Sequence, residues 1–422
     1  MKMEKKVHFK FKKATKMRLQ LFFCSCFLVF SSIAQVPNSW LKKADFLGSK
    51  REQAVGFSIG DKGYIATGVD TSETVKNDLW EYNSITDSWT QRADLPSIGR
   101  RSAFGFSLNG LGYIGGGVDA DEAQLGNVLT DFWEYNPTSN TWVSKAVFPG
   151  GNGFGVYYAT SFSIDNKGYV CGGKIGPNSY SNQLWEYKPS NNTWTQRSNF
   201  PGGLRYNLSS LAVGNVAYIG LGTNQDNYCN DWWQYNPGSN QWVQKTNFIG
   251  GQRGGASTFV IGENGYVCLG TNGALKDDLF MYDPDNNQWY PRANYGGSER
   301  KQAISFNIGN RAFVGTGSGV SGKKASMYEY ISLDELALEE WSAIQLTVYP
   351  NPSKEKITIS AGDQLITGVK IYNEAGVISI DQLENTVQLE VSLTELPAGN
   401  YHLYVEFENG RKIAHSAFQI ID

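Results

Sequence analysis

Histidine supplies much of the acid–base and metal-binding chemistry of proteins at neutral pH, and this chain of 422 residues contains three. His8 lies in a basic N-terminal segment, and His402 and His415 lie close to the C-terminus. Residues 35–331 contain no histidine. Type-2 copper and catalytic zinc sites use imidazole ligands, and serine or cysteine triads use histidine as the base. We therefore expect no copper oxidase, zinc enzyme or histidine-dependent hydrolase in this stretch, and no catalytic residue or histidine-based metal site is assigned there.

Arginine recurs at matched places in the same stretch, thirteen residues before a recurring tyrosine or phenylalanine. These arginines are Arg51, Arg100, Arg205, Arg253 and Arg300. Aspartate recurs two residues before a second recurring aromatic, as Asp78, Asp131, Asp231 and Asp278. One repeat has Val156 and Gln183 at these two places, and the last has Ser326 instead of the acid. Because the repeat that lacks arginine also lacks aspartate, we expect partly buried, bidentate pairs within each repeat. The pairs are Arg51–Asp78, Arg100–Asp131, Arg205–Asp231 and Arg253–Asp278. The alternative is a ring of arginines that is open to an anion.

A glycine-rich segment carries the aromatic residues Phe154, Tyr157 and Tyr158, and Tyr180 follows it. Two departures from the repeat lie beside it: Val118–Thr130 is about four residues longer than its counterpart, and residues 149–155 add about three. Aromatic faces beside polar loops suit sugar stacking or a protein contact. We therefore expect a ligand surface here, between the second and third repeats. The alternative is that Tyr157 and Tyr158 begin a strand and that one of them packs inside.

The longer loop also contains three acidic residues, Asp119, Asp121 and Glu122. Carboxylates at this spacing could bind calcium. The alternative is a solvated acidic loop that holds no ion.

Three aromatic marks recur in the same order along residues 36–331, at steps of 47 to 56 residues. The first is Tyr64, Tyr113, Tyr169, Tyr218, Tyr266 and Phe313, each opening a short run that is rich in β-branched or aromatic residues and ends in glycine. The second is an aromatic-x-Tyr pair, as in Trp80 and Tyr82, and the third is a Trp that follows a polar turn, as in Trp89. Four short strands in about 50 residues are one propeller blade. The diglycine, Tyr and Trp marks resemble the kelch repeat, which implies an all-β, six-bladed, galactose-oxidase-like propeller over residues 35–331.

The N-terminal segment is expected to close this ring. Ser39-Trp40 resembles Ser88-Trp89, and five complete repeats carry the Trp mark while the last lacks it. We therefore expect the strand that holds Trp40 to be the outer strand of the blade that contains Phe313 and Tyr330. Such closure removes two exposed sheet edges. The alternative is a five-bladed ring with frayed ends.

Residues 332–344 are rich in acidic residues and break the period, which indicates a linker. From residue 345 to 422, alternating apolar residues separated by Gly and Pro turns predict a small antiparallel sandwich. This segment opens with Tyr349-Pro350-Asn351-Pro352, and Gly399 and Tyr401 belong to a Leu-Pro-Ala-Gly-x-Tyr motif. The two motifs resemble the C-terminal sorting domain of type IX secretion cargo. The resemblance implies recognition by the type IX machinery and a product that is secreted or attached to the cell surface. The alternative is an immunoglobulin-like adhesion module.

Residues 1–34 indicate a secretory signal peptide. Eight basic residues and one acid precede an apolar run from Leu19 to Ile33, which ends in small residues. The run of 15 residues is short for a membrane anchor, which needs about 20. Removal of the segment would change the formal net charge from −3 to −10, which argues against a nucleic acid or an anionic membrane as partner. Three cysteines would remain, too few and of the wrong parity for a disulfide framework.

These observations favour an exported, non-catalytic propeller that binds a glycan or a protein through loops on one face. The alternative is an extracellular carbohydrate-active enzyme of the kelch class, similar to sialic-acid epimerases, which would need only carboxylates and arginines. No cofactor is expected beyond the calcium ion considered above. The sequence identifies neither the ligand nor the oligomeric state.

Overall fold

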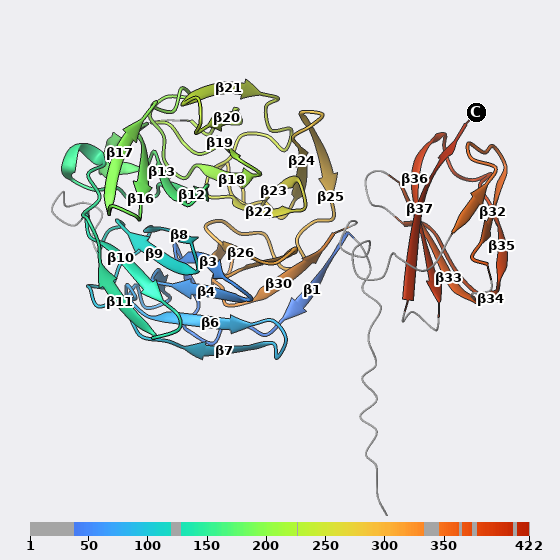
Figure 1. The fold of residues 1–422 in the computed structure, drawn as a ribbon, viewed down its shortest axis with the longest axis horizontal. Helices are drawn as coiled ribbons and strands as arrows, with labels where there is room; N and C mark the ends of the chain where they lie inside the picture. Colours follow the sequence, from blue (N-terminus) through green and yellow to red (C-terminus); the bar gives the residue numbers. More distant parts are fainter. Residues whose placement is uncertain are drawn as a thin grey trace, which may run out of the picture. The chain divides into compact units, whose positions relative to one another are not determined.

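The computed structural model describes residues 38–119, 128–225, 227–332, 346–362, 365–373, 378–407 and 412–421. Within residues 38–332, six four-stranded antiparallel sheets follow one another around a central axis (Figure 1). The predicted all-β class and the six blades are confirmed. The predicted signal peptide at 1–34 and all but the first residue of the predicted linker lie outside the described residues.

Each blade runs from an inner strand at the axis to an outer strand at the rim. Blade one contains β3 (Val55–Ile59), β4 (Lys62–Ala66), β6 (Leu79–Asn83) and β7 (Ser88–Gln91), and blade two contains β8 (Phe104–Leu108), β9 (Leu111–Gly115), β10 (Phe132–Asn136) and β11 (Thr141–Ser144). Blade three contains β12 (Thr160–Ile164), β13 (Lys167–Cys171), β16 (Leu184–Lys188) and β17 (Thr193–Arg197), and blade four contains β18 (Ser209–Val213), β19 (Val216–Gly220), β20 (Trp232–Asn236) and β21 (Gln241–Lys245). Blade five contains β22 (Ser257–Ile261), β23 (Asn264–Cys268), β24 (Leu279–Asp283) and β25 (Gln288–Arg292), and blade six contains β26 (Ile304–Ile308), β27 (Arg311–Gly315), β30 (Met327–Ile331) and β1 (Ser39–Lys43).

Blade six is closed by the N-terminal strand, as the Trp mark predicted. β1 pairs antiparallel with β30, and Trp40 lies opposite Tyr330 in the register. The two rings are 5.1 Å apart, similar to the 4.8 Å between Tyr82 and Trp89 in blade one. The first and last parts of the propeller sequence are therefore held in one sheet, and no blade is left open.

A turn residue joins each blade to the one before it. These residues are Asn38, Asp87, Asn140, Asn192, Asn240 and Asn287, all in the left-handed region with φ between 47° and 56°. Asn and Asp tolerate this conformation better than other side chains that carry a Cβ. Each side-chain oxygen accepts a hydrogen bond from a tyrosine hydroxyl of its own blade, at 2.6–2.9 Å. The same oxygen accepts from a backbone N–H that follows the preceding blade, at 2.8–3.0 Å.

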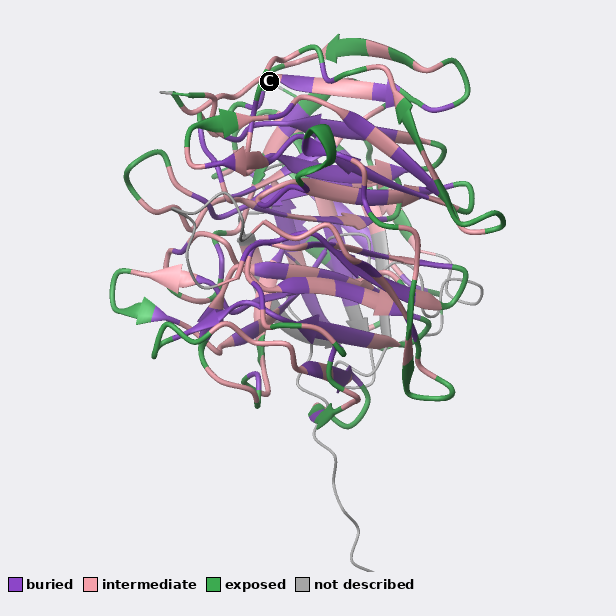
Figure 2. Ribbon diagram, turned by 90° about the vertical axis from the view of Figure 1, so that its left-hand side faces the viewer, coloured by how far each residue is buried: buried purple, intermediate pink, exposed green. Residues whose placement is uncertain are grey.

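The core of the propeller is aromatic and lies between adjacent blades. Tyr64, for example, is 1% exposed, stacks on Phe57 at 5.5 Å and meets Tyr135 of the next blade at 5.9 Å. Burial of each such ring contributes about 1.5–3 kcal/mol before entropy is counted. Exposed residues concentrate in the turns and loops (Figure 2). The rigid part of the molecule is thus the wall of blades, and the loops at its two ends are available for contacts.

The C-terminal region forms two sheets with one shared core. The first contains β31 (Thr347–Tyr349), β32 (Lys356–Ser360) and β35 (Gln388–Ser392). The second contains β34 (Ile378–Thr386), β33 (Ile366–Asn373), β36 (Gly399–Phe407) and β37 (Lys412–Ile420). Ile357 and Ile359 from the first sheet pack with Ile371 and Leu403 from the second, and all four are fully buried. This is the antiparallel sandwich that the alternation of apolar residues predicted.

Candidate functional site

One end of the central channel is framed by a closed ring of backbone hydrogen bonds. Among the residues that line this end, which we call the mouth, six form the ring: Gln53, Ser102, Tyr158, Asn207, Gly255 and Gln302. Each lies just before an inner strand and has φ between 54° and 63°. Each backbone N–H donates to the carbonyl of the equivalent residue in the preceding blade, at 2.8–3.4 Å, and Gln53 donates to Gln302 to complete the circle. The left-handed backbone, which costs roughly 1 kcal/mol or more at each non-glycine position, is held in place by this ring.

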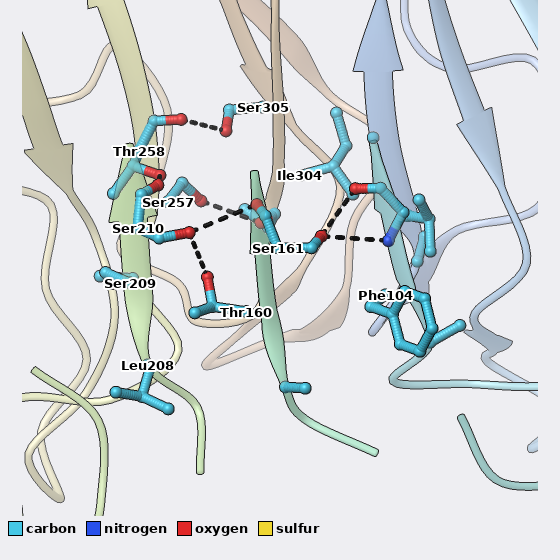
Figure 3. A pocket seen from close by; sticks show the side chains of 18 residues that line it. Phe104, Thr160, Ser161, Leu208, Ser209, Ser210, Ser257, Thr258, Ile304 and Ser305 are labelled. Atoms are coloured by element: carbon cyan, nitrogen blue, oxygen red, sulfur yellow. Dashed lines mark hydrogen bonds between the residues drawn. The ribbon is translucent and has the colours of Figure 1, made fainter. Parts of the chain in front are cut away.

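Below the mouth, hydroxyl side chains join the inner strands to one another (Figure 3). Ser210 Oγ donates to the carbonyl of Ser161 at 3.3 Å, and Thr258 Oγ1 donates to the carbonyl of Ser210 at 2.6 Å. Ser305 Oγ continues the series to the carbonyl of Thr258, also at 2.6 Å. The cavity at this level has a volume of about 180 Å³, and the opposite end widens to about 510 Å³. The residues that line the channel have small, apolar, hydroxyl or amide side chains, so the wall offers hydrogen bonds and no ionised group.

Aromatic side chains gather beside the mouth over blades three and four. Tyr180, in the short β15 (Ser179–Tyr180), stacks on Tyr206 at 5.2 Å with an angle of 12° between the rings. Tyr158 meets Tyr206 at 6.1 Å. Lys174, at the start of β14 (Lys174–Gly176), places its Nζ 5.4 Å from the Tyr206 ring. These residues are all half-buried, and we call this set of four the tyrosine patch.

The structure separates the four predicted ligand residues. Tyr158 and Tyr180 belong to the tyrosine patch. Tyr157 is fully buried, so the packing alternative describes it correctly and its side chain is not part of an open surface. Phe154 is 64% exposed after the turn Gly151–Gly153, and no ring contact between it and the tyrosine patch is recorded among the described residues. The patch joins blades three and four, whereas the sequence placed the surface between blades two and three.

Sequence reasoning missed Tyr206. Its position follows Arg205 as Tyr157 follows Val156 in the preceding repeat. The predicted surface was chosen by loop insertions, and repeat four has no insertion at this position. An alignment of the six repeats by their arginines would have placed Tyr206 beside the mouth.

The other side of the mouth is charged. The position that Tyr206 has in blade four, directly after the repeated arginine, is occupied by Glu52 in blade one, within β2 (Arg51–Glu52). Arg101 and Lys301 occupy it in blades two and six. Burial raises the pKa of Glu52, against the opposing effect of Lys323, whose Nζ lies 3.9 Å from its carboxylate. The residues beside the mouth therefore form an aromatic sector at blades three and four and a charged sector at blades one, two and six.

The structure brings each of the four predicted Arg–Asp pairs together inside a blade. Arg51 Nη1 lies 2.5 Å from Asp78, and Arg100 Nη1 lies 2.6 Å from Asp131. Arg205 with Asp231 and Arg253 with Asp278 form the same ion pair. The four arginine side chains are 0–5% exposed, so they do not form an arginine ring that is open to the channel. In three of these blades a tryptophan Nε1 also donates to the aspartate, at 2.7–2.9 Å.

The three predicted calcium ligands fall partly outside the described residues. Asp119 is described, but Asp121 and Glu122 lie outside the described residues. Among the described residues, no cluster of three His, Cys, Asp or Glu side chains could hold a metal ion.

In the C-terminal domain, the two predicted motifs meet at the last strand. Asn351 Nδ2 donates to the carbonyl of Ala417 at 3.2 Å, and its Oδ1 accepts from the N–H of Gln419 at 3.0 Å. Tyr401, on β36, is 3% exposed and stacks on Phe418 of β37 at 5.7 Å. Tyr349 and Pro350 are exposed, and Pro352 continues the same exposed turn. Gly399 pairs with Ile420 in the register of β36 and β37. Both motifs therefore pack against residues 417–420.

Comparison with known families supports both parts of this description. A family model described as the KLHDC2/KLHL20/DRC7 kelch-repeats domain matches residues 151–317. A model described as the secretion system C-terminal sorting domain matches residues 347–417. No curated protein matches the chain significantly.

A solved structure has the same fold. The structure of YjhT is 15% identical in sequence and superposes with a TM-score of 0.55, over 68% of this chain and 96% of that one. Within the described residues, no helix has the length and apolar character needed to cross a membrane.

The sorting domain sends its cargo through the type IX system to the cell surface or the extracellular space. The recurring aromatic marks, the six blades, the matched family models and the similar solved fold agree with one another. The chain is therefore an exported kelch-repeat β-propeller protein with a C-terminal type IX sorting domain.

Proposed function

We propose that the propeller is a binding module that recognises a glycan or another protein through the tyrosine patch at the mouth. The observation that supports this most is the stacked pair of Tyr180 and Tyr206, with Tyr158 at the channel edge and Lys174 beside the rings. Flat, rigid aromatic rings supply contact area at a low entropic cost, and aromatic side chains dominate the energetics of many interfaces.

The frame around the patch supports recognition by a preformed surface. Tyr158 is held by the backbone ring of the mouth, where its N–H donates to Ser102 at 3.0 Å and its carbonyl accepts from Asn207 at 2.9 Å. Lys174 exchanges two backbone hydrogen bonds with Tyr157, at 2.7 Å and 3.0 Å. A ligand that binds residues already fixed in this way does not have to order them first. The neutral channel wall below provides further hydrogen-bonding groups for a ligand that enters the mouth.

The full chain should be screened on a glycan array and, in parallel, on a peptide library, each with and without calcium. Tyr206→Ala and Tyr180→Ala should each weaken binding of a ligand found in this way by roughly tenfold or more, as expected for interface anchors. Tyr290→Ala, on the outer strand of blade five, is the matched control and should bind as the unchanged protein does. Melting curves of all three variants report whether they fold.

Two results would contradict the proposal. The first is unchanged affinity in folded Tyr206→Ala and Tyr180→Ala. The second is chemical turnover of a bound glycan, which would favour the alternative of a carbohydrate-active enzyme.

A further inference from the structure

Blade six contains a buried arginine whose surroundings match those of its counterparts. Arg300 is 1% exposed. Its Nε donates to the carbonyl of Ser298 at 3.0 Å, and its Nη1 donates to the carbonyl of Thr316 at 3.0 Å. The guanidinium lies 4.9 Å from the centre of the Tyr295 ring. In blade one, Arg51 has the same three contacts, with Ser49, Thr67 and Phe46, at 3.1, 2.8 and 4.8 Å.

The difference between the two blades is the carboxylate. Asp78 accepts hydrogen bonds from both terminal nitrogens of Arg51, at 2.5 and 2.7 Å. Blade six has Ser326 at the position of Asp78. Among the described residues, no carboxylate lies within ion-pair distance of Arg300, and its side chain donates hydrogen bonds through Nε and Nη1 but not through Nη2.

The backbone around the missing acid is preserved. The carbonyl of Ser326 accepts from the N–H of Thr316 at 3.2 Å, and the carbonyl of Asp78 accepts from the N–H of Thr67 at the same distance. The two blades therefore hold this segment in the same way. The serine side chain is shorter than that of aspartate and brings no carboxylate to the guanidinium.

In blade three, neutral side chains replace both the arginine and the acid. Val156 replaces the arginine and Gln183 replaces the acid. Gln183 Oε1 accepts from the N–H of Gly151 and from Trp185 Nε1, both at 3.1 Å. Blade three thus loses both charges, whereas blade six keeps the buried cation and loses its partner. A buried charge without a partner costs several kcal/mol of stability. An anionic ligand that pairs with Arg300 would offset this cost.

In three other blades, water reaches the carboxylate that pairs with the arginine. The side chains of Asp78, Asp131 and Asp278 are 18–29% exposed, and Ser326, at the same position in blade six, is half-buried. Lys42, on β1 of the same blade, places its Nζ 5.3 Å from the Tyr328 ring and pairs with Asp45. Burial lowers the pKa of Lys42, and the charge of Arg300 lowers it further.

We propose that the space between Arg300 and Ser326 binds the carboxylate group of a small organic acid. The two oxygens would accept from Nη1 and Nη2, as the aspartate oxygens do in blades one and two. The hydroxyl of Ser326 provides one further donor at the rim. A planar carboxylate matches the guanidinium fork better than a spherical or tetrahedral anion does. This site lies on blade six and is independent of the tyrosine patch.

Acetate is the simplest probe, because its methyl and carboxylate groups match the end of an aspartate side chain. The thermal midpoint of the full chain should be measured at pH 7 in sodium acetate and in sodium chloride of equal ionic strength. At about ten times its dissociation constant, acetate should raise the midpoint by roughly 2–4 °C over chloride. Isothermal titration should give one site.

Two variants separate this site from general salt effects. Ser326→Asp restores the pair, and it should raise the midpoint in chloride and abolish the response to acetate. Asp78→Ser creates the same space in blade one, and it should lower the midpoint in chloride and give two acetate sites. An acetate response that survives in Ser326→Asp would overturn the proposal, as would a lower midpoint of that variant in chloride. Equal stabilisation by acetate and chloride would mean an adventitious ion only and would also refute it.

Discussion

The ion pair between Arg100 and Asp131 allows a sharp test of the energetics of the blades. Asp131 binds both terminal nitrogens of Arg100, at 2.6 and 2.7 Å, and accepts from Ser97 Oγ and Trp133 Nε1, each at 2.7 Å. The Arg100 side chain is fully buried, and the Asp131 side chain is 29% exposed. Removal of one partner of a buried pair costs about 3–5 kcal/mol. Because water reaches Asp131, we expect Asp131→Ala to lose about 3 kcal/mol, at the lower end of that range.

Urea denaturation followed by tryptophan fluorescence measures this loss. The double variant Arg100→Met with Asp131→Ala removes the charge that the single variant leaves without a partner. It should therefore recover about 1 kcal/mol or more of the loss. A loss below about 1 kcal/mol in Asp131→Ala would show that the pair behaves like an exposed ion pair and would refute the reasoning.

The pH dependence of the same pair has a definite sign. Burial raises the pKa of Asp131, but the hydrogen bonds and charge of Arg100 outweigh it, and the net pKa lies below the ordinary value. A carboxylate with a lowered pKa in the folded state stabilises the protein above its unfolded pKa of about 3.9, and this stabilisation is lost as the pH falls. The stability difference between the unchanged protein and Asp131→Asn should thus be constant from pH 7 to about pH 5 and shrink below about pH 4. A difference that grows on acidification would contradict this assignment.

Three further outcomes are expected. Deletion of residues 345–422 should leave a folded propeller in the periplasm, and normal surface display of that truncation, measured by cell fractionation, would contradict the sorting role. Trp40→Ala should destabilise the propeller by about 3 kcal/mol in urea, because the indole of Trp40 in the closing strand β1 packs against Tyr330 of β30. Cys171 and Cys268 are fully buried, and burial raises the pKa of the Cys171 thiol to about 12, whereas Cys229 is half-buried. In protein that lacks residues 1–34, and with them Cys24 and Cys26, a thiol reagent at pH 8 should therefore label Cys229 alone.

The repeat could be interpreted from sequence because the side chains that carry it are large and periodic. Trp40 indicated the closing strand because it is the one Trp mark outside the regular series. The Arg–Asp pairs were predictable because Val156 and Gln183 replace both members in a single blade. Paired loss is expected of groups that bind each other, since removal of one leaves the other buried and uncompensated.

The mouth could not be predicted in the same way. Its six left-handed positions are held by backbone hydrogen bonds, and the residues there include glutamine, serine, tyrosine, asparagine and glycine. Backbone hydrogen bonds do not require particular side chains, so the sequence gives little indication of this ring. Asparagine is common at positive φ, but tyrosine is unusual there, so Tyr158 gave no sequence signal for a left-handed turn. The predicted surface therefore included Tyr158 and Tyr180 but not Tyr206 or Lys174.

Sixfold repetition makes the propeller its own set of controls. A residue type that recurs at one position in all blades indicates what the propeller fold requires there. A blade with a different residue at that position shows which changes the fold tolerates. Blade three departs by replacing both charges with a neutral, hydrogen-bonded glutamine and a valine, which leaves no electrostatic cost. Blade six departs by removing only the acid, and the buried cation keeps its contacts with Ser298, Thr316 and Tyr295 but has no carboxylate beside it among the described residues. Only blade six therefore keeps a buried cation that a bound carboxylate could pair with. The search for a small-molecule ligand with a carboxylate should begin at Arg300.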